Sequence, residues 1–242
     1  GRCGCCGYTF RDGSTAAAWQ GHRMQNVNAT RLEALVRAAA RARQSGDFAT
    51  ALAIAGQAEQ EHLAHPLLLR VQAEALAVAG RYAEAGQLLN RALALAPSDA
   101  LTITDIGRVL VAENRVEEAI RAFEAAVTAR PELAAAWLEL GSACEIAGDD
   151  TAARTAYERA KSLAPGKAEA CASLATIAMR RGDATQARTL AEEALRLQAD
   201  HPGARRVGPL AQLAAGRRRH PRPQRQNLSP AHLAGQQPRP AR

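Results

Sequence analysis

A period of 34 residues constrains the fold of this chain more than any other feature of its sequence. Glycines recur at this spacing, and the one position without glycine holds asparagine, which best replaces glycine in a left-handed turn. Prolines and two sets of alanines share the period. The positions are Gly46, Gly80, Asn114, Gly148, Gly182 and Gly216; Pro97, Pro131 and Pro165; Ala51, Ala85, Ala119, Ala153 and Ala187; and Ala58, Ala92, Ala126, Ala160 and Ala194. Four sets of positions with one period predict tandem copies of one structural unit.

Each unit is predicted to contain two helices joined by a tight turn. In the unit 66–99, the first helix is expected to run to about Ala79, and Gly80 ends it as a left-handed cap. The second helix is expected from near Tyr82 to about Ala96, and Pro97 stops it because proline cannot continue a helix. The other units are 32–65, 100–133, 134–167 and 168–201.

The alanine positions predict that the helices pack closely. Ala85 and Ala92 are seven residues apart and therefore share one face of the second helix. A larger residue stands between them, and successive units place Leu89, Phe123 and Tyr157 there. Because one hairpin cannot bury its apolar face alone, neighbouring hairpins are expected to stack.

The unit 134–167 carries the fullest motif. Its members are Trp137, Leu140, Gly141, Gly148, Ala153, Tyr157, Ala160 and Pro165. In these residues the chain resembles the tetratricopeptide repeat (TPR) family, over about 32–201 and in about five tandem repeats. The resemblance implies an all-α fold, a right-handed α-solenoid of antiparallel helix hairpins. The end units depart from the motif, since Ala55 and Ala191 replace the aromatic residue, and such drift is expected of terminal repeats.

The N-terminal end lies outside the periodic pattern. We expect a disordered leader at 1–28, followed by the five repeats at 29–201. The sequence leaves open whether residues 1–23 belong to the functional protein or are an upstream extension of it.

The C-terminal end breaks the period within a sixth unit. A partial repeat or capping helix is expected at 202–216, although Pro209 in mid-helix costs roughly 3 kcal/mol or more. Either Ala204–Ala215 packs as a cap, or the natural array continues beyond it. Residues 217–242 hold 5 of the 11 prolines and no acidic residue, which predicts a disordered Arg/Pro-rich tail.

The formal net charge of +7 comes from the ends of the chain. Residues 201–242 hold nine arginines and no acidic residue, whereas residues 31–200 hold 19 Lys and Arg against 23 Asp and Glu. The tail also lacks the interleaved aromatic residues on which nucleic-acid bases stack. A nucleic-acid partner is therefore not favoured.

Membrane insertion and secretion are not predicted either. No run of 18 apolar residues occurs, and the first 23 residues hold no continuous apolar stretch. The five cysteines are not spaced as a disulfide framework, which indicates a reducing compartment and predicts a cytoplasmic protein.

Candidate chemical groups are few and poorly arranged for catalysis. Cys3, Cys5 and Cys6 lack the spacing of a structural zinc site, and His62 with His65 is interpreted as a solvated helix end. Cys144 and Cys171 occupy first-helix packing positions. No hydrolase, metalloprotease, P-loop or dinucleotide-binding motif is present. We therefore expect no catalytic residue, no metal and no cofactor.

The resemblance implies that first helices line a concave groove that holds a peptide. Helical spacing selects the first-helix residues that we expect to be exposed in this groove: Arg70, Glu74, Leu101, Thr104, Arg108, Val111, Leu138, Ser142, Glu145 and Thr176. Their mixture of apolar and charged side chains suits an extended peptide or an amphipathic helix. Val36 and Ala40 replace the polar clamp with which some family members hold a C-terminal carboxylate.

These observations predict a non-catalytic scaffold or adaptor that binds a protein or peptide. One alternative is the N-terminal TPR region of a larger bacterial enzyme, such as a TPR-containing sulfotransferase, whose catalytic domain lies beyond residue 216. Another is self-association through the C-terminal repeat.

Overall fold

The computed structural model describes the backbone of residues 15–217 and the side chains of residues 27–214. This part of the chain contains eleven α-helices and no β-strand. The helices are α1 Thr15–Gln44, α2 Phe48–Gln60, α3 Pro66–Val78, α4 Tyr82–Leu95, α5 Ala100–Ala112, α6 Val116–Ala129, α7 Ala134–Ile146, α8 Asp150–Leu163, α9 Ala168–Arg180, α10 Ala184–Leu197 and α11 Pro202–Arg217. The predicted all-α fold of paired helices is confirmed.

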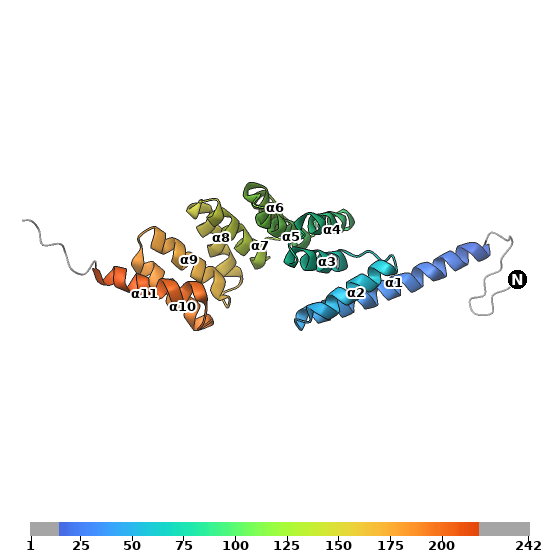
Figure 1. Cartoon of the computed structure of the whole chain (residues 1–242), viewed down its shortest axis with the longest axis horizontal. Coiled ribbons are helices and arrows are strands. Elements are labelled where there is room, and N and C mark those ends of the chain that lie inside the picture. The colour runs from blue at the N-terminus through green and yellow to red at the C-terminus, as the bar shows by residue number, and fades with distance from the viewer. Residues whose placement is uncertain (1–14, 218–242) are drawn as a thin grey trace, which may run out of the picture. The chain divides into compact units, whose positions relative to one another are not determined.

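The chain divides into two compact units, residues 1–170 and 171–242. Within the first unit, consecutive helices pack as the hairpins α1–α2, α3–α4, α5–α6 and α7–α8 (Figure 1). Each second helix also packs against the first helix of the next hairpin, so the four hairpins stack in chain order. In the second unit, α11 packs against α10.

The turns between paired helices adopt the left-handed conformation that the glycine period predicts. The φ angles are 77° at Gly46 and Gly80, 83° at Gly148, 79° at Gly182 and 62° at Asn114. After Gly80, the Arg81 backbone N–H donates to the Leu76 carbonyl oxygen at 2.9 Å, which satisfies a carbonyl at the helix end. A side chain other than Asn would be strained at these positions.

Small residues at fixed positions bring the paired helices together. Ala51, Ala85 and Ala119, with their later counterparts Ala153 and Ala187, are all 0% exposed. A Cβ atom at Gly107 would lie only 2.5 Å from the Phe123 ring. The alanine and glycine positions therefore mark places where no larger side chain fits.

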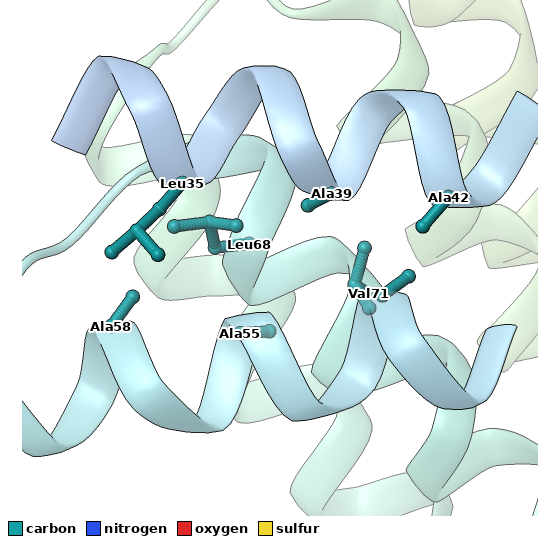
Figure 2. Packing of buried hydrophobic residues seen from close by; sticks show 8 residues of the cluster. Leu35, Ala39, Ala42, Ala55, Ala58, Leu68 and Val71 are labelled. Atoms are coloured by element: carbon teal, nitrogen blue, oxygen red, sulfur yellow. The ribbon is translucent and has the colours of Figure 1, made fainter. Parts of the chain in front are cut away.

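The first hairpin has a core made of small residues from its own helices. Leu35, Ala39 and Ala42 of α1 face the alanines of α2, and Figure 2 shows Leu68 and Val71 between the two helices. These last two residues belong to α3, so the second hairpin completes the core of the first.

Helix α1 begins at Thr15, which corrects the expected leader boundary at residue 28. Thr15 is followed by three alanines, the best helix formers, and this explains the early start. The expectations for residues 1–14 and 218–242, including the disordered tail, lie outside the described residues.

Helix α11 packs against α10 in the second unit. Ala204, Val207 and Ala211 face inward and are at most 5% exposed. Pro209 lies inside the helix, is itself exposed, and does not interrupt it. The helix thus packs on α10, while Leu210 and Leu213 stay more than half exposed.

Candidate peptide-binding surface

The candidate groove residues come from equivalent places on successive first helices. Arg70, Thr104 and Leu138 are 34 residues apart in turn, and so are Glu74, Arg108 and Ser142. Helices α3, α5 and α7 carry all the candidates except Thr176, which lies on α9 in the second unit. The candidates of the first unit are therefore described together, and Thr176 is described by itself.

Arg70 is buried, and the expectation that it is exposed is wrong. Arg70 is only 7% exposed, and its Nε donates a hydrogen bond to Asp105 Oδ2 at 2.6 Å. The partner acid lies on the next first helix, so the arginine lies folded over the contact between hairpins. Replacing Arg70 would leave the Asp105 carboxylate without its closest cation, so Arg70 stabilises the stack.

Arg108 is the cation on this surface that stays accessible. Its side chain is 50% exposed, while Nε donates to Glu139 Oε1 at 2.8 Å and Nη1 donates to Asp105 Oδ1 at 3.2 Å. Burial by itself lowers the pKa of Arg108, but the carboxylates of Glu139, Asp105 and Glu74 outweigh it and raise the pKa. Two of the guanidinium donors are used in these bonds, and the group has five.

Glu74 also takes part in an ion pair between hairpins. Its Oε2 lies 3.1 Å from Arg43 Nη2 of α1. Ion pairs therefore join α1 to α3, α3 to α5, and α5 to α7. We call this set the ion-pair ladder, and its members are Arg43, Glu74, Arg70, Asp105, Arg108 and Glu139.

The selection of candidate residues from the sequence missed Asp105 and Glu139. A spacing signal could have found them, because Arg108 and Glu139 are 31 residues apart. One repeat minus one helical turn gives this separation, so the two side chains meet across adjacent first helices. Arg43 and Glu74 have the same separation.

Two threonines in the candidate set satisfy their hydroxyl groups within their own helices. Thr104 is 3% exposed, and its Oγ1 donates to the Ala100 carbonyl oxygen at 2.7 Å. The expectation that Thr104 is exposed is therefore wrong. Thr176 is partly buried, and its Oγ1 donates to the Ala172 carbonyl oxygen at 3.1 Å.

The remaining candidates are partly buried. Leu101, Val111 and Leu138 present part of their apolar surface, as Ser142 does with its hydroxyl group. Glu145 accepts a hydrogen bond from the Tyr157 hydroxyl at 3.0 Å, which links α7 to α8. The surface thus combines partly exposed apolar side chains with the half-exposed Arg108.

Cys144, Cys171 and His65 are buried or partly buried. Cys144 is a buried free thiol, and burial raises its pKa, which keeps it protonated. Cys171 is 0% exposed. His65 Nδ1 accepts from the Leu67 backbone N–H at 3.1 Å and so caps α3. Cys3, Cys5 and Cys6 lie outside the described residues. In the described part of the chain, no group of three metal-binding side chains gathers.

A membrane span requires a helix that combines sufficient length with apolarity. No helix within residues 15–217 is both long enough and apolar enough to cross a bilayer.

Comparison with known families agrees with the stacked hairpins and their small-residue contacts. The family model for the tetratricopeptide repeat matches residues 32–100 and 104–168, which is more than half of the chain. The chain belongs to the tetratricopeptide repeat family. The TPR fold and its about five tandem repeats are thus shown by the motif, the helix pairs and the family match together. No curated protein matches the chain.

Solved TPR structures resemble this TPR chain in fold. A chain of the APC/C hetero-tetramer Cut9–Hcn1 has a TM-score of 0.66 and 20% identity, over 74% of this chain and 35% of that one. The thermophilic TPR protein TTC0263 of Thermus thermophilus has a TM-score of 0.62 and 19% identity, over 75% of this chain and 99% of that one. MamA has a TM-score of 0.55 and 21% identity, over 67% and 95%. At these identities the likeness concerns the fold alone.

Proposed function

We propose that this TPR chain is a non-catalytic scaffold that binds an extended or helical segment of a partner protein along the first helices α3, α5 and α7. The observation that carries the proposal is the half-exposed Arg108 on this surface. Glu139 and Asp105 fix its position, yet the bonds that they make leave guanidinium donors for a ligand. Leu101, Val111 and Leu138 supply apolar surface on the same helices.

The ion-pair ladder also supports the proposal, because it makes the surface rigid before a ligand arrives. Each link spans two hairpins, so their relative positions are held without a partner. A surface that is already ordered loses less conformational entropy on binding. We therefore expect Arg108 to act as a recognition residue and Arg70 as a residue that stabilises the surface.

The test is a random 12-residue peptide library displayed on phage and selected against the immobilised full chain. Enriched peptides are synthesised, and their dissociation constants are measured by fluorescence anisotropy. We expect Arg108→Glu to weaken the binding of one class of these peptides by at least about tenfold, which corresponds to about 1.4 kcal/mol of binding free energy. The substitution removes the donors and places a third carboxylate beside Asp105 and Glu139.

The matched control is Arg121→Glu, the same charge reversal at an exposed residue of the second helix α6. This control should leave the affinity unchanged. Equal affinity of every enriched peptide for wild type and Arg108→Glu would overturn the proposal. Equal weakening by both substitutions would also overturn it, because net charge alone would then explain the binding.

We place the scaffold in the cytoplasm. The buried free thiol of Cys144 supports this assignment, since a reducing compartment keeps such a thiol unpaired.

A further inference from the structure

Two adjoining hollows lie where α2, α3 and α4 meet in the first unit. One has a volume of about 360 Å³ and the other about 520 Å³. Both are lined by Glu59 of α2, Gln72 of α3 and Arg91 of α4, so they form one continuous depression. We call it the α2–α4 hollow. No member of the ion-pair ladder lines it, so it is separate from the surface proposed above.

Apolar and polar side chains line the α2–α4 hollow together. Leu52, Leu76 and Leu88 contribute large side chains to the wider part, and Leu52 is 40% exposed. The smaller part is lined by Ala55, at the position that Leu89, Phe123 and Tyr157 occupy in the following second helices. Ala55 itself is only 1% exposed, because it belongs to the core of the first hairpin. A space of this size accommodates one or two large side chains of a ligand.

Polar groups replace apolar ones at this contact between hairpins. Gln72 stands where the next first helices have Ile106 and Leu140, and Glu59 stands where the next second helix has Leu93. The Gln72 Nε2 donates to Glu59 Oε2 at 2.9 Å and to the Ala55 carbonyl oxygen at 3.3 Å. The carboxylate of Glu59 is thereby held by Gln72 in the lining that the two parts of the hollow share.

Two arginines, Arg81 and Arg91, and two carboxylates, Glu59 and Glu84, line the α2–α4 hollow. Arg81 is paired with Glu84 through two short hydrogen bonds from its guanidinium. Arg91 is exposed, and among the described residues no ion pair includes it. A ligand carboxylate placed beside Arg91 would therefore meet a cation that no protein carboxylate already engages.

We propose that the α2–α4 hollow is a second peptide-binding site, for a segment that buries large apolar side chains against Leu52, Leu76 and Leu88 and places a carboxylate beside Arg91. The ligand is an acidic, apolar peptide segment, and its site is independent of Arg108. The TPR chain then holds two partner segments at once, one on the first helices and one between second helices.

The test uses the same phage-displayed library, selected on the full chain and followed by anisotropy measurements on synthetic peptides. We expect a class of enriched peptides that combine Leu, Met or Phe with Asp or Glu. Leu52→Arg and Arg91→Glu should each weaken this class at least about tenfold, while Arg91→Lys retains most of the affinity. Because Leu52 and Arg91 are exposed, both variants should keep the wild-type thermal midpoint, which circular dichroism checks.

Arg108→Glu is the control that separates the two sites. Peptides of the α2–α4 hollow should bind this variant with unchanged affinity. If the library yields no peptide that Leu52→Arg and Arg91→Glu weaken, the hollow is only a packing irregularity and the inference is wrong. If only Arg108→Glu weakens the binding of the enriched peptides, the inference about the hollow is wrong but the scaffold proposal stands. An amide replacement of the peptide carboxylate should weaken binding to wild type but not to Arg91→Ala, and the reverse outcome rejects the pairing with Arg91.

Discussion

The middle hairpins and the first hairpin fill their cores in different ways. In α5–α6 and α7–α8, an aromatic ring of the second helix rests directly on a glycine of the first, as Phe123 does on Gly107 and Tyr157 on Gly141. In α1–α2, the corresponding residues are Ala39 and Ala55, both buried and both small. The same hairpin geometry is therefore reached with very different side-chain volumes.

Residues of the neighbouring hairpin fill the space that the small Ala55 leaves in the core of the first hairpin. Leu68 and Val71 of α3 complete the core of α1–α2. One repeat later, the positions of these two residues hold Thr102 and Asp105. Where a large residue of the second helix fills the core, the next first helix can carry polar side chains at these positions. Asp105 is one of them, and it pairs with Arg70 in the ion-pair ladder. In the first hairpin, residues of the neighbouring hairpin therefore supply the apolar volume that Ala55 lacks.

The largest expected effect comes from removing the ring in a middle hairpin. Phe123 is 0% exposed, and Phe123→Ala should lower the free energy of unfolding by about 3–5 kcal/mol, since nothing nearby can refill the space over Gly107. At the equivalent position, Ala55→Gly should cost only about 1–2 kcal/mol, from one lost methyl group and lower helix propensity. Urea unfolding followed by circular dichroism measures both, and equal losses would contradict the comparison.

A smaller effect is expected from adding one methyl group to the glycine partner. The Cβ of Gly107→Ala would lie 2.5 Å from the Phe123 ring, and overpacking should cost about 1–3 kcal/mol. The matched control is Gly56→Ala in α2, where an added Cβ meets no atom within 4 Å. This control should stabilise the protein by up to about 1 kcal/mol, because alanine is the better helix former. The two alanine substitutions should therefore shift the urea midpoint in opposite directions.

The repeat sequence predicted the helix pairs, the left-handed turns and the close helix contacts. These features depend on one or two residues at fixed positions, such as Gly80 at a turn or Ala85 at a contact. The backbone requirement is the same in every repeat, so it leaves a periodic trace in the sequence. For this reason, the fold could be read from the 34-residue period even where Asn114 replaces glycine.

The exposure of the groove residues could not be read in the same way. Helical spacing places Arg70 and Glu74 one turn apart on α3, yet Arg70 is buried and Glu74 is exposed. The difference arises because the Arg70 side chain lies across to Asp105 on the neighbouring hairpin, a contact between repeats. The early start of α1 at Thr15 was also missed, since residues 15–28 carry no repeat motif.

The junctions between the first and second hairpins and between the second and third hairpins have different helix caps. Their stability should respond to pH differently, and this is the smallest expected effect. His65 caps α3 through Nδ1, while Asp99 caps α5 by accepting from the Leu101 and Thr102 backbone N–H groups. Burial lowers the pKa of His65 from its usual 6.5, although the charge of Asp99 opposes this. For Asp99, burial raises the pKa, but the Thr102 hydrogen bond and the Arg70 charge outweigh it and lower the pKa.

A histidine whose pKa is lowered by folding binds a proton more readily in the unfolded chain. The stability that His65 contributes is therefore complete above about pH 6.5 and declines as the pH falls toward its folded-state pKa. Asp99 has a lowered carboxyl pKa, so its contribution is complete above its usual 3.8 and is lost only below that. Between pH 7.5 and pH 5.5, the first junction should weaken while the Asp99 cap does not.

The measurement is the urea midpoint of wild type and His65→Asn at these two pH values. Asparagine accepts the same capping bond but does not titrate, so the variant should lose less stability on acidification than wild type. The other histidines are common to both proteins, and the difference between the two shifts isolates His65. An identical shift in both would mean that protonation leaves the α3 cap intact. The first junction would then differ from the middle hairpins in its packing volume but not in its response to pH.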